Sequence, residues 1–293
     1  MRYFTIILPV YNDWDCLQIL LGQIEDTLKG TDANFELLLI NDGSNNFSDL
    51  NFNKKKFFNK IRIINLRKNV GSQKAIATAL KYISNNNEKF KRDFIIMDSD
   101  GEDDPNKIQL ILDLLKQNNR IKLITLNRTI RKESFFFSIL YELHLFITFL
   151  FTFNYIRFGN FSYINMDVIN KISKKRELWF AYSAAINKFF KKKISVIAPR
   201  KNRITGQSKM SYINLFKHSI SIQSVFKKNI YLSYLLFLSM GLISLMSGMS
   251  EILFIGLLIL LTLHYIILNF LKLNQSEISF DKCLDNIVSI DQK

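Results

Sequence analysis

Cysteine and histidine are scarce in this chain of 293 residues. The two cysteines, Cys16 and Cys283, stand far apart, and the three histidines do not cluster in the sequence. This spacing argues against a zinc site built from cysteine or histidine. Two isolated cysteines also argue against a disulfide framework and for a reducing compartment.

Glycine-rich nucleotide-binding motifs are absent as well. No G-x-G-x-x-G follows the first apolar segment, which disfavours a dinucleotide site, and no Walker A pattern occurs. That first segment, Tyr3–Val10, is short and leads directly into Asn12 and Asp13 without a small-residue cleavage site. We therefore expect a buried strand there rather than a signal peptide.

Positive charge and apolar side chains, in contrast, are abundant. The formal net charge is +15, and hydrophobic residues make up 48% of the chain. A basic excess is typical of proteins that bind nucleic acid, an anionic membrane surface or phosphorylated substrates. The length suits one sizeable domain with an additional element, or two small domains.

Two uncharged runs account for the additional element. No charged residue occurs between Lys228 and Glu251, or from Ile252 to Leu271. Each run has ~20 residues, which is enough to cross the hydrocarbon core of a bilayer. With the tight connection at 248–251, the pattern predicts a transmembrane helical hairpin at 229–272. A buried helix pair of a soluble protein is the alternative.

The charges that flank the two runs predict their topology. Lys227 and Lys228 precede the first run and Lys272 follows the second, whereas the connection contains no Lys or Arg. By the positive-inside rule, both termini are expected on the cytoplasmic side. Residues 1–226 then form a cytoplasmic domain, and residues 273–293 form a cytoplasmic tail.

Further segments are expected to lie along the membrane rather than cross it. Residues 134–156 are dense in Phe, Leu and Tyr, but Glu142 and His144 interrupt them, which favours an amphipathic interfacial helix. A second such helix, at 208–226, leads into the hairpin. The basic run Lys191–Lys193 is expected to attract anionic lipid head groups.

The N-terminal part alternates between strand and helix patterns. Short apolar runs predict strands at residues 5–9, 35–40, 61–66, 94–97, 121–126 and 194–198, and amphipathic segments between most of them predict helices. The stretch Gly159–Ser162 is predicted to be a turn. This alternation indicates an α/β, Rossmann-like fold with a mostly parallel sheet and helices on both faces.

Three of the predicted strands end in polar loops, at residues 9–13, 41–44 and 98–104. Because the carboxyl ends of parallel strands share one edge of the sheet, the three loops are expected to lie close together, where α/β sheets bind ligands. Asp42 could accept a hydrogen bond there from a ribose or a base. Alternatively, Asp42-Gly43 is only a turn.

The third of these loops is strongly acidic. Five of its seven residues carry carboxylates: Asp98, Asp100, Glu102, Asp103 and Asp104. Asp98 and Asp100 are spaced to reach one hard cation, Mg²⁺ or Mn²⁺, and such ions commonly also hold substrate phosphates. The alternative is a solvated acidic turn that caps the helix beginning near Pro105.

Five motifs, taken in their order along the chain, resemble those of a known family. They are Pro9-x-Tyr11-Asn12, Asp42-Gly43-Ser44, Asn69-x-Gly71, Asp98-x-Asp100 and Arg203-x-x-Gly206-x-Ser208-Lys209. Together they are similar to the inverting GT-A glycosyltransferases of family 2. The resemblance is strongest to the polyprenyl-phosphate (dolichol-phosphate mannose synthase-like) branch, which often carries a C-terminal transmembrane hairpin. It covers about residues 3–272.

The resemblance implies roles for particular residues. Those implied to bind the nucleotide of the donor are Pro9, Tyr11, Asn12, Asp13, Ile40, Asp42, Gly43 and Ser44. Those implied to hold the divalent ion and the diphosphate are Asp98, Asp100 and Glu102, with Ser99 as a further substrate contact. Those implied to bind phosphate groups of the donor or the acceptor are Arg128, Arg131, Arg203, Ser208 and Lys209. The catalytic set implied in this way is Asp98, Asp100, Arg128, Arg203 and Lys209.

Several positions depart from the family's usual pattern. Asp13 stands where a Glu is usual, Asn41 where an Asp-Asp-Gly-Ser motif has its first Asp, and Glu102 where a Gln is common. The pair Asp103-Asp104 makes the third loop more acidic than usual. These departures bear on the identity of the donor more than on the reaction class.

The expected function is transfer of a sugar from a UDP- or GDP-linked donor to a polyprenyl or dolichyl phosphate. Charge develops on the leaving diphosphate, where a metal ion and Arg or Lys side chains stabilise it. A lipid phosphate is already an anionic nucleophile, so the reaction needs no strong general base.

Two alternatives remain at this stage. A transferase acting on a hydroxyl of a lipid-linked saccharide, in cell-envelope polysaccharide assembly, would need a carboxylate base, for which Asp103 and Asp104 are the candidates. From another class, the chain could be a non-catalytic membrane partner that keeps the fold. The expected partners are the nucleotide sugar, the lipid acceptor and the membrane, with a second copy of the chain left open and no nucleic acid.

Overall fold

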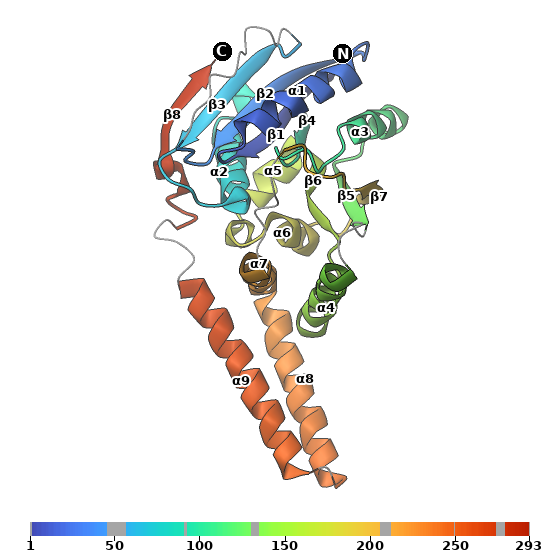
Figure 1. The fold of residues 1–293 in the computed structure, drawn as a ribbon, viewed down its shortest axis with the longest axis vertical. Coiled ribbons are helices and arrows are strands. Elements are labelled where there is room, and N and C mark those ends of the chain that lie inside the picture. Colours follow the sequence, from blue (N-terminus) through green and yellow to red (C-terminus); the bar gives the residue numbers. More distant parts are fainter. Residues whose placement is uncertain are drawn as a thin grey trace. The chain divides into compact units, whose positions relative to one another are not determined.

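The structure divides into two compact units. The computed structural model describes residues 2–45, 57–90, 93–129, 135–205, 212–248, 250–273 and 279–292. An α/β unit contains residues 1–133, 157–209 and 278–293, and a helical unit contains residues 134–156 and 210–277. Figure 1 shows the elements of both units along the chain.

A single sheet forms the centre of the α/β unit. Among the described residues its strands are β1 (Arg2–Val10), β2 (Ala33–Asn41), β3 (Lys60–Leu66), β4 (Asp93–Ile96), β5 (Leu123–Thr129), β6 (Phe158–Asn165), β7 (Ile194–Pro199) and β8 (Ile287–Gln292). Their order is β7-β5-β6-β4-β1-β2-β3-β8. β1 pairs in parallel with β2 and β4, and β2 with β3, so the carboxyl ends of these four strands share one edge.

Helices cover both faces of this sheet, as the sequence predicted. They are α1 (Trp14–Leu28), α2 (Ser72–Asn85), α3 (Asn106–Gln117), α5 (Met166–Ile172) and α6 (Tyr182–Phe189), with 3₁₀ helices η2 (Asn87–Lys89), η3 (Arg176–Trp179) and η4 (Cys283–Asn286). Apolar residues of α1 and α3 join those of β1 and β2 in one buried cluster. α2 contacts α5, α6 and η3 on the other face. Because each layer buries its apolar stripe against the sheet, the α/β prediction is confirmed.

The predicted turn at Gly159–Ser162 is wrong, because these residues lie inside β6. Ser162 pairs with Ile96 of β4 on one side and with Thr125 of β5 on the other, both antiparallel. A Gly-Asn pair is a turn signal in isolation. Here the two neighbouring strands supply hydrogen-bond partners on both sides, and this tertiary pairing overrides the local preference.

The strand β8 was not predicted at all. Its residues follow the polar segment after 273 and show no regular alternation of apolar and polar side chains. β8 pairs antiparallel with β3, from Arg62 opposite Gln292 to Leu66 opposite Ile287. The far end of the chain therefore completes the sheet beside its third strand, as Figure 1 shows.

The helical unit contains α4 (Phe135–Thr152), α7 (Tyr212–Ser224), α8 (Lys227–Met246) and α9 (Glu251–Leu273). Within the described residues, two stretches, 227–246 and 251–270, are long and apolar enough to span a membrane. Only 17% and 11% of their most apolar windows are buried, whereas a core helix of a soluble protein would be mostly buried. The two helices fit the predicted hairpin. α4 and α7 lie within the two segments predicted as interfacial helices, and their place at a membrane stays a prediction.

A buried ion pair connects β2 and β3. Arg62 Nη1 lies 2.9 Å from Glu36 Oε2, and Arg62 Nη2 donates to the carbonyl of Lys89 at 2.9 Å. The two charged side chains are only 7% and 12% exposed. Removing one partner would therefore leave a charge buried without compensation.

We expect Arg62→Ala to lower the free energy of unfolding by about 3–5 kcal/mol, because Glu36 stays buried without its partner. Denaturant unfolding of the full chain in detergent measures this change. Lys116→Ala is the matched control, since it removes an exposed ion pair with Asp113 and should change the stability little. An equal, small effect of both variants would contradict this view of the pair.

Candidate functional site

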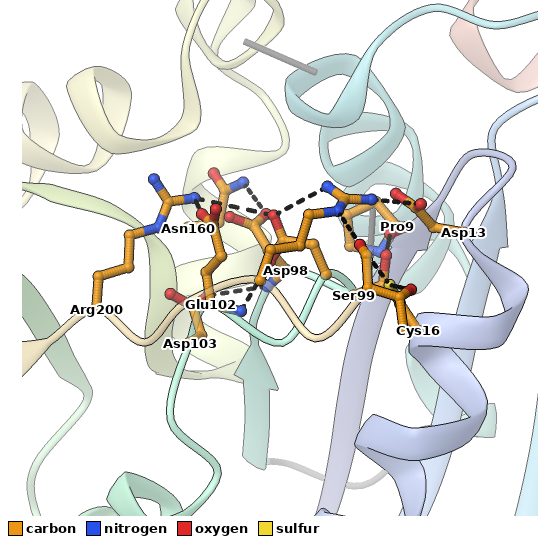
Figure 2. Close-up of polar contacts among 12 residues, drawn as sticks. Pro9, Asp13, Cys16, Asp98, Ser99, Glu102, Asp103, Asn160 and Arg200 are labelled. Atoms are coloured by element: carbon orange, nitrogen blue, oxygen red, sulfur yellow. Dashed lines mark hydrogen bonds and ion pairs between the residues drawn. The ribbon is translucent and has the colours of Figure 1, made fainter. Parts of the chain in front are cut away.

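The acidic loop after β4 is met by three arginines from other parts of the α/β unit. Arg128 comes from β5, and Arg200 and Arg203 come from the segment after β7. Figure 2 shows Arg200, Asp98, Glu102 and Asp13 in this polar cluster at the carboxyl edge of the sheet. The loop is therefore not the solvated acidic turn that was the alternative.

Asp98 is the most completely bound of the carboxylates. Its Oδ2 accepts from Arg128 Nη2 at 2.8 Å, and its Oδ1 accepts from Asn160 Nδ2 at 2.7 Å. Burial alone would raise the pKa of Asp98, but Arg128, Arg200 and Asn160 outweigh it and lower the pKa. Asp98 is accordingly held as a carboxylate.

Asp103 holds the backbone of Asp98 in place. Its Oδ2 accepts from the backbone N–H of Asp98 at 3.0 Å, and its Oδ1 lies 3.6 Å from Arg128 Nη2. Burial raises the pKa of Asp103 to about 6, with Arg128 opposing and Asp98 adding to the shift. Asp103 thus fixes the loop rather than facing solvent.

Asp100 is bound more loosely to the arginines. Its Oδ1 accepts from the backbone N–H of Glu102 at 3.1 Å, while its Oδ2 lies 3.8 Å from Arg203 Nη1 and 3.9 Å from Arg200 Nη2. Burial and repulsion from Asp98 raise its pKa to about 6. Oδ2 of Asp100 is therefore the carboxylate oxygen of this loop with the longest ion pairs.

The segment 200–205 lies across the acidic loop. Its backbone donates from Lys201 N to the carbonyl of Glu102 at 2.8 Å and from Ile204 N to the carbonyl of Asp100 at 3.3 Å. Gly101, with φ +77°, makes the approach possible, because a Cβ there would lie 2.3 Å from Ile204 Cδ1.

Side chains of the same segment add further contacts. Arg203 Nη2 pairs with Asp13 in the loop after β1, and Arg203 Nε donates to the carbonyl of Thr205 at 2.8 Å. Arg200 pairs with Glu102. The segment is thereby attached both to the acidic loop and to the end of β1.

The other two predicted loops meet next to this cluster. Asn12 N donates to Ser44 Oγ at 3.0 Å, and Asn45 N donates to Asn12 Oδ1 at 2.9 Å. Ser99 Oγ donates to the carbonyl of Pro9 at 2.7 Å, which joins the acidic loop to the first one. The three strand ends are thus adjacent, as the parallel-sheet argument predicted.

Asp42 acts as an internal acceptor in this arrangement. Its two carboxylate oxygens accept from Val70 N at 2.8 Å and Gly71 N at 2.9 Å, just before α2. Burial raises the pKa of Asp42 to about 6, although these N–H groups and Lys74 oppose the shift. Asp42 therefore fixes the backbone at the start of α2. This structural role applies whether or not Asp42 also contacts a ligand.

Some predicted residues are not brought to the site. Ile40 is fully buried in the sheet and offers no exposed surface to a ligand. Tyr11, in contrast, belongs to the first loop and is 37% exposed there. The predicted residues Arg131, Ser208 and Lys209, together with Gly206, lie outside the described residues.

The predicted metal ligands do not form a ready cage. In the part of the chain that the structure describes, no three His, Cys, Asp or Glu side chains are grouped so as to hold a metal ion. The arginines lie between the carboxylates, and Glu102 is paired with Arg200. The ligand role of Asp98, Asp100 and Glu102 remains a prediction.

Two residues of the cluster were missed from the sequence. Asn160, which binds Asp98, fell within the supposed turn, and its Oδ1 also accepts from Gln73 Nε2 at 2.8 Å. Arg200 precedes the recognised motif by three positions. A basic run with Arg at 200 and 203 was the available signal, but its contacts come from the path of the segment after β7.

The charges of the cluster do not cancel. Five carboxylates face three guanidinium groups, which leaves a formal excess of two negative charges. The carboxylates are those of Asp13, Asp98, Asp100, Glu102 and Asp103, and the guanidinium groups are those of Arg128, Arg200 and Arg203. A site of this kind can take up a divalent cation, and its arginines can exchange carboxylate for phosphate partners.

Known proteins resemble this chain in sequence and in fold. An uncharacterized glycosyltransferase of Bacillus subtilis, YkcC, is 28% identical over 136 residues, which cover 46% of this chain and 39% of the relative's length. Glucosyl-3-phosphoglycerate synthase from Mycobacterium tuberculosis aligns over 78% of this chain and 80% of its own, with a TM-score of 0.51 and 11% identity. At that identity the likeness shows the fold alone.

The family is shown by a longer match. Residues 5–176, more than half of the chain, match the family described as glycosyl transferase family 2. This range contains most of β1, all of β2 to β6 and all of the acidic loop. The GT-A fold predicted from the sequence is confirmed, and the chain belongs to the glycosyl transferase family 2.

Proposed function

We propose that this chain is a membrane-anchored glycosyltransferase that moves a sugar from a nucleotide-sugar donor to a polyprenyl phosphate. The observation that carries the proposal is the convergence of Arg128, Arg200 and Arg203 on carboxylates at the carboxyl edge of the sheet. Both substrates of such a reaction carry phosphate, and a guanidinium group can bind two phosphate oxygens through two hydrogen bonds.

The donor half of the proposal is supported by the family and by a structural neighbour. The mycobacterial synthase was solved with Mn²⁺, UDP-glucose and phosphoglyceric acid. By analogy, the nucleotide of the donor would lie at the ends of β1 and β2, where Asn12, Asp13 and Ser44 gather.

The acidic loop fits a divalent cation in charge and in chemistry. The excess of two negative charges matches one such ion, and carboxylate oxygens suit Mg²⁺ and Mn²⁺. Asp98 and Asp100 are the residues we assign to hold it, because Asp98 is held as a carboxylate and Asp100 Oδ2 makes only long ion pairs with the arginines. A bound ion would supply Lewis-acid stabilisation of the leaving diphosphate. Arg128 and Arg203, now paired with carboxylates, would bind phosphate oxygens.

The acceptor half is supported by the surroundings of the two candidate bases. Asp103 is 4% exposed and holds the loop through Asp98 N and Arg128. Asp104 pairs with Lys201 at 2.8 Å and accepts from Asn106 N. Because both carboxylates are committed, an acceptor that needs no base is favoured. A lipid phosphate is such an acceptor, whereas a sugar hydroxyl is not.

Membrane anchoring rests on α8 and α9 and gives a topology prediction. Lys227 and Lys228 at the start of α8 and Lys272 near the end of α9 favour cytoplasmic termini. A reporter fused after Lys293 should therefore behave as a cytoplasmic one. A reporter signal from the opposite side would mean a single span, or three spans with residues 134–155 inserted.

Transfer assays test the proposal directly. Membranes containing the chain would be incubated with radiolabelled UDP- and GDP-sugars and polyprenyl phosphate, and lipids would then be extracted. We expect label in a lipid that carries one sugar. Label that appears only on a lipid-linked saccharide would support a hydroxyl acceptor instead. No transfer from any donor to either acceptor would support a non-catalytic partner.

A further inference from the structure

The C-terminal strap, defined as residues 279–292, is held in the α/β unit by buried residues in its first part and by strand pairing in its last part. Phe280 lies 6.1 Å from Trp179 between ring centroids, and the carbonyl of Phe280 accepts from Lys81 Nζ at 2.9 Å. Cys283 is fully buried. The strap then forms β8 on the edge strand β3, as Figure 1 shows. A segment without any sequence signal is thus a built part of the domain.

Two asparagines connect the strap to the loop after β2. Asn65 Nδ2 donates to Ser289 Oγ at 2.9 Å and to Asp291 Oδ2 at 2.8 Å. Asn65 Oδ1 accepts from Asn41 Nδ2 at 2.9 Å, and Asn41 Oδ1 accepts from Ser44 N at 3.0 Å. The chain of hydrogen bonds therefore runs across β8, β3 and β2 and ends on the loop that holds Asn12.

The donor and acceptor roles along this series of hydrogen bonds are fixed by Asp291. A carboxylate at Asp291 only accepts, so Asn65 must present its Nδ2 to the strap and its Oδ1 to Asn41. Asn41 must then donate, and its Oδ1 is left to accept from Ser44 N. An aspartate at position 41 would place a carboxylate against the Asn65 oxygen. The asparagine that departs from the family's usual pattern is explained by this contact.

A second contact runs to the neighbouring loop, at residues 67–71. Asn286, which is 5% exposed, accepts from Arg67 N at 2.8 Å through its carbonyl and donates to the carbonyl of Lys68 at 3.4 Å. Lys68 in turn packs on Gly43, where a Cβ would lie 2.6 Å from the Lys68 carbonyl carbon. The carboxylate of Asp42 binds the next turn of the same loop. The strap therefore contacts the loop at 67–71 directly and reaches the loop at 41–45 through Asn65 and Asn41.

We propose that the C-terminal strap positions the nucleotide-binding loops, with Asn65 and Asn41 as positioning residues for the donor. This inference rests on the proposed function, because that function places the nucleotide at the ends of β1 and β2, next to the loops at 41–45 and 67–71. The strap contributes no group to the reacting atoms. Its effect is on the affinity for the nucleotide and not on the chemical step.

The test is a swap of donor and acceptor between positions 65 and 291. Asn65→Asp faces the carboxylate of Asp291 and should weaken nucleotide binding about fivefold to tenfold, since it breaks one charge-assisted hydrogen bond. Asp291→Asn alone should have a small effect, because an amide oxygen still accepts. The double variant should recover most of the wild-type affinity, because the new amide donates to the new carboxylate. Asn41 can still donate to position 65 in every variant.

Binding of UDP and of GDP with MnCl₂ to the purified full chain in detergent would be measured by calorimetry, together with KM and kcat for transfer. We expect the change in KM to follow the change in Kd and kcat to stay within about twofold of wild type. Gln292→Glu is the control, because it adds a negative charge at the exposed residue next to Asp291, and Gln292 takes no part in these hydrogen bonds. Its affinity should equal that of the wild type.

The outcomes separate the inference from the proposed function. Wild-type affinity in Asn65→Asp, or a double variant that binds no better than Asn65→Asp, would overturn the positioning role alone. A wild-type chain that binds neither nucleotide would overturn the proposed function and this inference with it. A purely structural role predicts losses of thermal stability without the recovery of Kd in the double variant.

Discussion

Asp100→Asn should reduce sugar transfer on the order of 100-fold while the protein stays folded. The substitution removes one negative charge and almost no volume. The new amide can still accept the hydrogen bond from Glu102 N that Asp100 Oδ1 now receives at 3.1 Å. The shape of the loop should therefore persist. What is lost is the carboxylate charge at Oδ2, the loosely paired oxygen that we assign to the divalent cation.

Initial rates of transfer from the nucleotide sugar, and unfolding temperatures of the same samples, would measure this effect. Asp113→Asn is the matched control, since it makes the same change on the exposed face of α3 and should leave the rate unchanged. Excess EDTA should abolish wild-type transfer, and Mg²⁺ or Mn²⁺ should restore it. Full activity in EDTA would defeat the metal assignment.

Arg203→Lys should lower transfer at least tenfold with membrane association unchanged, an estimate that follows from losing a bidentate phosphate contact. Arg203 uses its planar fork in this structure: Nη2 pairs with Asp13, Nη1 faces Asp100, and Nε donates to the carbonyl of Thr205. A lysine keeps the charge but offers one point of contact. The competing view is that Arg203 belongs to a basic patch that attracts anionic lipid, for which a lysine is equivalent.

The two views differ in which measurement changes. Transfer rate and partition into vesicles with anionic lipid would be compared for the wild type, Arg203→Lys and Arg120→Lys. Arg120 is exposed in the turn before β5 and serves as a control for the loss of any arginine. Wild-type transfer by Arg203→Lys would contradict the phosphate contact and favour the lipid patch.

The elements predicted well are those with long or regular apolar patterns. β1 to β5 are short apolar runs that end in polar loops, and α1 to α3 carry their apolar residues on one face. Such elements are specified by nearby residues, because a helix or strand buries one face only when apolar residues recur at the spacing of that helix or strand. The loops at the ends of β1, β2 and β4 could then be placed together from the parallel order alone, so the proximity of Asn12, Ser44 and Ser99 was predicted without a structure.

The elements missed depend on partners distant in the chain. β6 contains a Gly-Asn pair that would form a turn in isolation, and it becomes a strand because β4 and β5 bind it on both sides. β8 has exposed side chains and a weak pattern, and it exists because β3 offers a free edge. Asn160 reaches Asp98 because β6 pairs with β4, and Arg200 reaches Glu102 because the segment after β7 crosses the acidic loop. No local preference encodes a contact of that kind.

The sequence by itself determined the family, the strand ends that carry the acidic and polar loops, and the two apolar helices, because each of these depends on residue type at short spacing. The tertiary structure decided how the charges are combined. It pairs Arg128 with Asp98, commits Asp103 and Asp104 to holding the loop, and brings the C-terminal strap to the loop after β2. These contacts join residues 30 to 226 positions apart or depend on the exact course of a loop, so only packing of the complete sheet can select them.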